Sequence, residues 1–293
     1  MRIIDSFMFF DESMLLDLRL NILNKYVSKF VICESTFSHN GDKKKLNFNI
    51  KEFTKFKSKI EYIVLDKEPT NLKTINHNDS PETKESKTLD NALIRENYQR
   101  NFTNSKLKEV DDNDLILIND LDEIPDLRNF SYEKKITIFK QKMLYFKLNL
   151  MYKNLSWTGS KICKKKDLLN PQWLRNVKTR KYPLWRFDIL FSKKKYNKLK
   201  IIEDGGWHFT NIKTAEEIHL KMKSFLHHYE YENSGLNPNS IEKLMKEEKA
   251  LYDYNADQRN NKWSNNAKLE KINLNILPEY INLNREKFKN WLS

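Results

Sequence analysis

The sequence LILINDLDEIPDL, residues 115–127, places a run of apolar residues directly before a cluster of acidic ones. Leu115 to Ile118 are all apolar, the pattern of a strand that is buried on both faces of a sheet. Four carboxylates follow within seven positions, at Asp120, Asp122, Glu123 and Asp126. In an open parallel sheet, ligands bind beyond the carboxyl ends of the strands. We therefore expect a binding site directly after Ile118.

Asp120 and Asp122 are candidates for holding a cation. Two carboxylates about 4 Å apart repel by about 4 kcal/mol at an effective dielectric of about 20, and a bound cation removes that repulsion. Oxygen ligands suit Mg²⁺ or Mn²⁺, which usually complete their shells with water and substrate phosphates. The alternative is a solvated acidic turn, because two aspartates separated by one residue are a weak signal by themselves.

The segments before this strand predict an α/β fold. Residues 3–10 predict a strand, and apolar residues at helical spacing up to Leu23 predict a helix, with Arg19 available for its solvent face. Residues 29–33 and 60–65 predict two further buried strands. Strands and helices in this order are typical of a mainly parallel, Rossmann-like sheet that is flanked by helices.

The rest of the chain is less regular. Residues 66–88 are strongly polar and predict a surface loop, either a lid or a plain disordered insertion. The predicted elements that follow are a helix over 89–107, a strand over 143–151, and helices over 214–230, 239–253 and 278–292. We expect one α/β domain over residues 1–210, and a helical C-terminal extension over residues 211–293 that packs on it.

A second motif, EDGGWHF at residues 203–209, combines small, aromatic and metal-binding residues. Its two glycines permit close approach of a ligand to the backbone. Trp207 offers a flat face for a sugar or a base, and His208 is a candidate nitrogen ligand for Mn²⁺. A histidine buried in the core is an equal alternative. The other histidines show no metal-ligand spacing: His39, His77, His219, His227 and His228.

Two arginines precede the acidic strand on the predicted helix. Arg95 and Arg100 are five positions apart, so they point about 140° apart around the helix axis and at most one faces the site directly. The guanidinium of Arg100 can neutralise a diphosphate. It can equally form a salt bridge with the acidic turn.

The composition limits the partners and the compartment. The 293 residues carry a formal net charge of +13, which favours anionic partners, although a lysine-rich solvated surface explains it as well. Two scattered cysteines form neither a disulfide framework nor a zinc site, as expected of a cytoplasmic protein. No apolar stretch reaches the length of a membrane span, so contact with a membrane is expected to be peripheral at most.

Four stretches, taken in order, resemble glycosyltransferase family 17, which includes the eukaryotic enzyme that adds the bisecting N-acetylglucosamine to N-glycans. They are FMFFDESMLLDLRLNILNKYVSKFVICESTFSHNG from residue 7, NYQRNFTNSKL from residue 97, LILINDLDEIPDL from residue 115 and GGWHF from residue 205. The resemblance implies a GT-A-type fold, and an inverting transfer from a nucleoside-diphosphate sugar, expected to be linked to uridine diphosphate (UDP). It implies no nucleic-acid partner.

The resemblance also assigns site residues. It implies that Asp120 and Asp122 form the D-x-D motif, in which Asp122 binds Mn²⁺ or Mg²⁺ and Asp120 touches the metal or the donor ribose. His208 matches the histidine that completes the metal shell in many GT-A enzymes. Glu34, at the end of a strand, falls where the base and ribose of the donor lie, and Arg95, Arg100 and Trp207 are further donor-binding candidates.

The resemblance stops short of the acceptor. We expect no counterpart here to the membrane anchor and stem of the eukaryotic members, and residues 153–200 do not align. The bisecting reaction and its N-glycan acceptor are therefore not carried over. We expect transfer of a sugar, with N-acetylglucosamine first, to a microbial or viral glycan or to a lipid-linked glycan.

Inversion requires a carboxylate that deprotonates the acceptor hydroxyl. The candidates are Asp204, Glu203 and Asp188, with Asp204 first because the neighbouring glycines leave room for a sugar. Two other functions stay open. One is a metal-dependent nuclease or nucleotidyltransferase, which would need a second set of carboxylates. The other is a non-catalytic glycan-binding module that uses its six Trp and thirteen Tyr for stacking.

Overall fold

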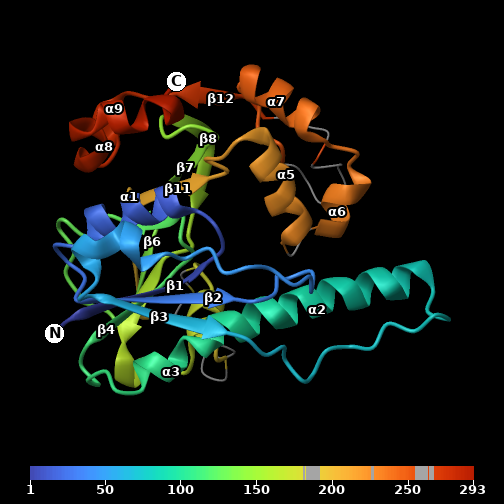
Figure 1. The fold of residues 1–293 in the computed structure, drawn as a ribbon. Coiled ribbons are helices and arrows are strands. Elements are labelled where there is room, and N and C mark those ends of the chain that lie inside the picture. The colour runs from blue at the N-terminus through green and yellow to red at the C-terminus, as the bar shows by residue number, and fades with distance from the viewer. Residues whose placement is uncertain (181, 183–191, 226–227, 255–262, 264–266) are drawn as a thin grey trace.

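The computed structural model describes residues 1–180, 182, 192–225, 228–254, 263 and 267–293. It shows an α/β protein in which helices flank two mixed sheets (Figure 1). The predicted fold class is therefore confirmed. Asp188 lies outside the described residues.

The first sheet has seven strands in the order β10-β6-β9-β4-β1-β2-β3. Their bounds are β1 (Ile3–Phe9), β2 (Lys29–Ser35), β3 (Ile60–Leu65), β4 (Leu115–Ile118), β6 (Ile136–Phe139), β9 (Lys161–Lys164) and β10 (Leu199–Ile202). The strand β9 is antiparallel to both of its neighbours, β4 and β6, whereas the other pairs are parallel. The prediction of a mainly parallel sheet thus holds for this sheet, with β9 as the exception.

The second sheet has five strands in the order β12-β8-β7-β11-β5, and only β7 and β11 are parallel. Their bounds are β5 (Glu123–Pro125), β7 (Gln141–Tyr145), β8 (Leu150–Trp157), β11 (Gly206–Thr210) and β12 (Leu269–Lys271). The single strand predicted over 143–151 is wrong. Phe146 has a φ of 64°, and the chain reverses between β7 and β8 to form a hairpin.

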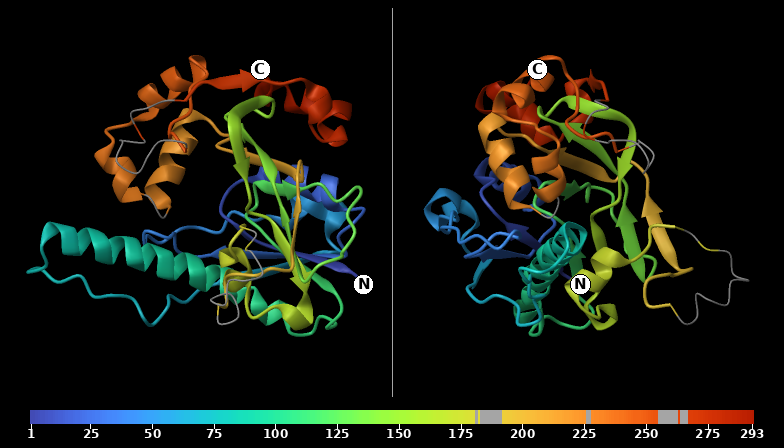
Figure 2. Two further views of the ribbon diagram at one scale, coloured as in Figure 1. Left: turned by 180° about the vertical axis from the view of Figure 1, so that it is seen from behind. Right: turned by 90° about the vertical axis from the view of Figure 1, so that its right-hand side faces the viewer.

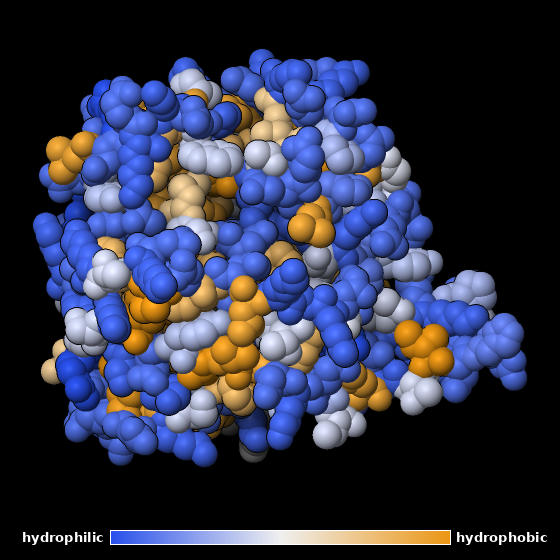
Figure 3. Space-filling view, viewed as in Figure 1, coloured by the Kyte–Doolittle hydropathy of each residue, from blue (hydrophilic) through white to orange (hydrophobic). Residues whose placement is uncertain are grey.

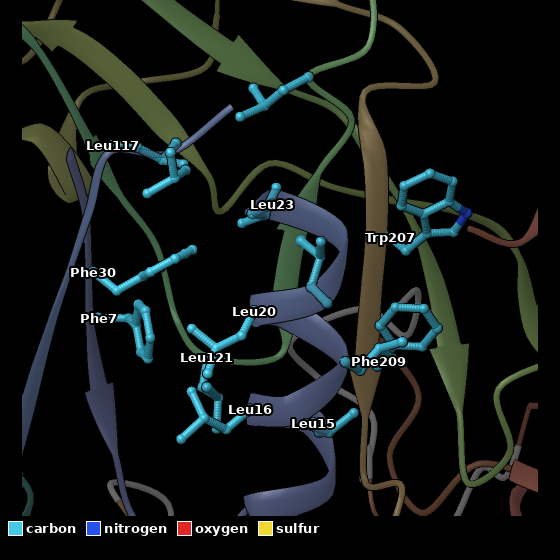
Figure 4. Packing of buried hydrophobic residues seen from close by; sticks show 14 of the residues in the cluster. Phe7, Leu15, Leu16, Leu20, Leu23, Phe30, Leu117, Leu121, Trp207 and Phe209 are labelled. Atoms are coloured by element: carbon cyan, nitrogen blue, oxygen red, sulfur yellow. The ribbon is translucent and has the colours of Figure 1, made fainter. Parts of the chain in front are cut away.

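The helix α1 (Ser13–Leu23) lies between the two sheets. Figure 4 shows it between Phe7 and Phe30 of the first sheet and Trp207 and Phe209 of the second, all members of one buried apolar cluster. Because sheets cover α1 on both sides, Arg19 is fully buried. The expectation that Arg19 faces solvent is therefore wrong.

The helix α2 (Pro81–Phe102) begins well before the predicted start at residue 89. Ser80 caps it by accepting a hydrogen bond from the backbone N–H of Thr83. Its first turns are polar all round, so they lack the apolar stripe by which a helix is predicted from sequence. This end projects from the molecule beside the preceding segment (Figures 1 and 2), and the projection is mostly hydrophilic (Figure 3).

The C-terminal region contains shorter helices than predicted, and also a strand. Over the described chain as a whole, the α-helices besides α1 and α2 are α3 (Asn104–Leu107), α4 (Pro171–Asn176), α5 (Ala215–Ser224), α6 (His228–Asn233), α7 (Pro238–Lys246), α8 (Glu279–Leu283) and α9 (Arg285–Phe288). Short 3-10 turns are η1 (Ile50–Phe56), η2 (Lys165–Asp167), η4 (Leu274–Ile276) and η5 (Lys289–Trp291). The strand β12 joins the second sheet through β8. The division at residue 210 stays a prediction.

In the part of the chain that the structure describes, no helix combines the length and the apolar character that crossing a bilayer requires.

Candidate active site

A cavity of about 530 Å³ lies where β1, β2 and β4 end. These strands are parallel neighbours, so the loops after them meet at one edge of the sheet. Each loop contributes to the lining: Glu12 follows β1, His39 follows β2, and Asp120 and Asp122 follow β4. The position agrees with the general rule for ligand sites in open α/β sheets.

Asp120 is held by two arginines. Its Oδ1 accepts a hydrogen bond of 3.0 Å from Nη2 of Arg100, and its Oδ2 accepts one of 2.6 Å from Nη2 of Arg175. Burial opposes ionisation of this carboxyl, but the two guanidinium charges outweigh it and hold the pKa of Asp120 well below its usual range. Of the two predicted arginines, Arg100 therefore lines the site, and it forms the salt bridge that the sequence left as one alternative.

Arg175 is fixed by Glu123 in turn. Its Nη1 and Nη2 each donate a 2.7 Å hydrogen bond to a different oxygen of the buried Glu123 carboxylate. Trp157 donates its indole N–H to the same carboxylate. A Cβ atom at Gly159 would lie 1.8 Å from Oε1 of Glu123, so only glycine leaves room for this arrangement. Arg175 and Trp157 both line the cavity.

The buried side chain of Arg19 holds the backbone of the acidic turn. Its Nη1 donates to the carbonyl oxygens of Asp120, Leu121 and Glu123, at 3.3, 3.1 and 2.7 Å. Its other nitrogens form a bidentate pair with the buried carboxylate of Asp5, at 2.8 and 2.7 Å. Asp5 thus supplies the countercharge, and Arg19 fixes the turn that carries the aspartates.

Asp122 and His208 also meet in the lining of this cavity. The strand β11 places His208 opposite Glu123 of β5, and the backbone N–H of Phe209 donates to the carbonyl of Asp122 at 2.8 Å. His208 Nε2 lies 3.5 Å from Asp122 Oδ1. Burial raises the pKa of Asp122, but His208 and Lys221 outweigh burial and lower the pKa overall. The two sequence motifs therefore form one site.

Lys221 of α5 brings a further charge to the cavity. Its Nζ lies 3.5 Å from Oε1 of Glu12 and 3.7 Å from Oδ2 of Asp122. Burial lowers the pKa of this ammonium group, but Glu12 and Asp122 raise it above the ordinary value of lysine. Lys221 is therefore positively charged, and it comes from the region after residue 210.

Two predicted donor-binding residues lie beside the cavity and not in its lining. Glu34 is fully buried, and its carboxylate accepts hydrogen bonds from Lys44 Nζ, from the backbone N–H groups of Asn47 and Phe48, and from the Tyr62 hydroxyl. Glu34 thereby positions Lys44, which does line the cavity.

Arg95 donates a 2.6 Å hydrogen bond to Glu68 and a longer one to the carbonyl of His39. Arg95 therefore contacts the backbone of His39, a residue that lines the cavity, without lining the cavity itself.

Trp207 points away from the cavity. Successive side chains of a strand face opposite sides, so Trp207 and His208 cannot both face the site. Trp207 is packed in the core beside α1 (Figure 4). Its indole N–H donates to the carbonyl of Ile276 at 2.8 Å. Its placement gives no support to stacking on a donor.

The predicted bases Glu203 and Asp204 lie at the surface, with side chains 68% and 82% exposed and paired with Lys140 and Lys142. They line a separate pocket of about 170 Å³. Both residues lie in the turn before β11, and neither lines the cavity that holds Asp122.

The side chains at the cavity fit a divalent cation only in part. Asp122 and His208 offer one oxygen and one nitrogen close together, whereas both oxygens of Asp120 are occupied by arginines. Nδ1 of His208 is buried and has no hydrogen-bond partner among the described residues. Within those residues, no three His, Cys, Asp or Glu side chains gather as a metal site. Two protein ligands suffice where substrate phosphates and water complete the shell, as is common for Mg²⁺.

Sequence reasoning missed Arg175, Trp157 and Lys221. The first two lie in the part of the chain that matched no motif, and the last lies in the extension. The one available signal was Gly159. The chain has only five glycines, and a glycine often marks a position where a side chain would not fit.

The model of glycosyltransferase family 17 matches residues 1–293. No curated protein matches the chain.

Proposed function

Because this chain belongs to glycosyltransferase family 17, and is thus a glycosyltransferase, we propose that its 530 Å³ cavity binds a nucleoside-diphosphate sugar with the help of Mn²⁺ or Mg²⁺. The observation that carries the proposal is the pairing of the Asp122 and His208 side chains, 3.5 Å apart, in a cavity that also contains Arg100, Arg175 and Lys221. Such a site has a position for a cation and positive charge that attracts a diphosphate.

In this proposal the charged groups divide the work. Asp122 and His208 would hold the cation, which neutralises charge on the departing diphosphate when it is bound. Arg100 and Arg175 keep Asp120 ionised and fixed, so that it accepts a hydrogen bond from the donor ribose. UDP-N-acetylglucosamine is the expected donor, with inversion at the anomeric carbon, and a glycan or lipid-linked glycan is the expected acceptor.

The acceptor hydroxyl must lose its proton to a carboxylate in the cavity. Glu96 and Glu12 line the cavity, whereas Glu203 and Asp204 do not. Glu12 is paired with Lys221, and Glu96 accepts a 2.8 Å hydrogen bond from Arg100. We therefore propose that the base is Glu96 or Glu12.

A thermal-shift screen of nucleoside-diphosphate sugars, with and without Mn²⁺, tests the proposal. A ligand that binds only the native state raises the melting temperature, and a tenfold excess over Kd stabilises by about 1.4 kcal/mol. We expect a UDP-sugar to stabilise the protein more with Mn²⁺ than with a chelator, and Asp122→Asn to abolish the difference. If no nucleotide sugar shifts the melting temperature in either condition, the proposed donor site is refuted.

A further inference from the structure

Among the described residues, four lysine and arginine side chains line the cavity, and three of them are hydrogen-bonded to carboxylates. Nζ of Lys44 lies 2.7 Å from Glu34, and Arg100 and Arg175 make carboxylate contacts between 2.6 and 3.0 Å. These three groups are committed to holding the walls of the site in place.

Lys221 differs from the other three. Its Nζ lies 3.5 Å from Glu12 and 3.7 Å from Asp122, beyond the ordinary range of N–H···O hydrogen bonds, which ends at about 3.2 Å. The ring of Phe225 lies 5.1 Å from the same nitrogen. The ammonium group is thus attracted to two carboxylates without being bound tightly to either. A phosphate oxygen that entered the cavity could offer it a shorter and stronger contact.

The position of Lys221 relative to Asp122 suggests which part of a ligand it meets. The two oxygens of the Asp122 carboxylate face different partners: Oδ1 faces His208, and Oδ2 faces Lys221. A group with several negative oxygens, such as a diphosphate, can contact both sides of Asp122 at once. A single carboxylate has too few charged oxygens to reach both sides, and a neutral sugar has none.

We propose that Lys221 binds the diphosphate of the sugar donor and stabilises it as the leaving group. The proposal rests on the proposed function. In the transfer, the bond between the anomeric carbon and the diphosphate oxygen breaks, and its electron pair stays on that oxygen. The acceptor oxygen bonds to the anomeric carbon and gives its proton to a carboxylate. Lys221 keeps its own proton throughout and donates hydrogen bonds to the phosphate oxygens.

The test compares Lys221→Met with Lys223→Met, an exposed lysine on the same helix. Titration calorimetry with UDP and with inorganic pyrophosphate measures diphosphate binding, and pyrophosphate makes the result independent of the donor base. We expect Lys221→Met to weaken both ligands about 10- to 100-fold, the usual loss for a hydrogen bond to a charged group, and to change uridine binding little. Lys223→Met should bind like the wild type, and Lys221→Arg should recover part of the affinity.

Two further measurements separate this role from a structural one. Mn²⁺ binding without nucleotide, followed by electron paramagnetic resonance, should be unchanged or tighter in Lys221→Met, because a competing cation beside Asp122 is gone. In the wild-type protein, UDP should protect Lys221 from reductive methylation more than it protects Lys223. This second experiment needs no variant, so it decides the matter even if Lys221→Met does not fold.

Three results would overturn the inference about Lys221. They are wild-type diphosphate affinity in Lys221→Met, loss of Mn²⁺ binding together with UDP binding, or equal methylation of Lys221 with and without UDP. A wild-type protein that bound neither UDP nor pyrophosphate would refute the donor site itself as well.

Discussion

Arg19 Nη1 lies 2.7 Å from the carbonyl oxygen of Glu123, and both residues are fully buried. The contact joins the central helix α1 to the turn that carries Asp120 and Asp122. The guanidinium also pairs with Asp5 on β1, so one side chain ties the turn to the helix and to the first sheet. The acidic residues that face the cavity are therefore placed by a charge that never reaches it.

Replacing Arg19 should destabilise the whole fold. Arg19→Met leaves the Asp5 carboxylate buried without its partner, and breaking a buried ion pair from one side costs about 3–5 kcal/mol. Urea denaturation should show this loss in the free energy of unfolding. The double variant Asp5→Leu/Arg19→Met should recover part of it, because no lone charge remains. A loss below about 1 kcal/mol in the single variant would contradict the proposed role of the pair.

Gly159→Ala should damage the site more than the fold. The new Cβ would overlap the Glu123 carboxylate, which must move and release Arg175 and Trp157. We expect UDP binding to weaken about tenfold or more, since one displaced charged hydrogen bond is enough for that loss. The matched control is Gly235→Ala, whose Cβ meets no atom within 4 Å. That control strains a left-handed φ of 71° but should leave UDP binding unchanged. Equal binding by both variants would mean that Glu123 does not organise the cavity.

The comparison between sequence and structure shows what each kind of signal can predict. The strand β4 and the acidic turn were predicted because an apolar run and a proline are local patterns. Arg175 reaches Asp120 across 55 positions of chain, and Lys221 reaches Asp122 from helix α5, which follows residue 210, so no local pattern marks either residue. Trp207 was misplaced for a different reason. The motif that contains it is a strand, and alternation along that strand turns His208 toward the cavity and Trp207 away from it.

Acid should destabilise the protein in part through Asp120. The pKa of Asp120 is depressed in the folded state by Arg175 and Arg100, so its stabilising contribution is present above the unfolded pKa of about 3.9. The contribution is lost as the pH falls below that value toward the folded pKa. We expect the melting temperature of Asp120→Asn to be lower than that of the wild type at pH 7, and the difference to shrink progressively as the pH falls below about 4. Calorimetric melting curves from pH 7 to pH 2 would measure both. Parallel curves for the two proteins over this range would exclude the predicted linkage.

Turnover should depend on a carboxylate in the cavity and not on Asp204. Asp204 is exposed, paired with Lys142 and located at a different pocket, so Asp204→Asn should keep the rate of sugar transfer within about twofold of the wild type. Replacing the true base should reduce kcat by about 10²–10⁴-fold, the usual contribution of general base catalysis, with little effect on donor binding. Glu96→Gln and Glu12→Gln, assayed side by side for kcat and for the Kd of UDP, would show which residue behaves in this way. Because Glu12 pairs with Lys221, a change in UDP affinity in Glu12→Gln alone would assign Glu12 to the diphosphate side and leave Glu96 as the base. Full activity in both variants would exclude both glutamates, and loss of transfer in Asp204→Asn with intact donor binding would return the role to the second pocket.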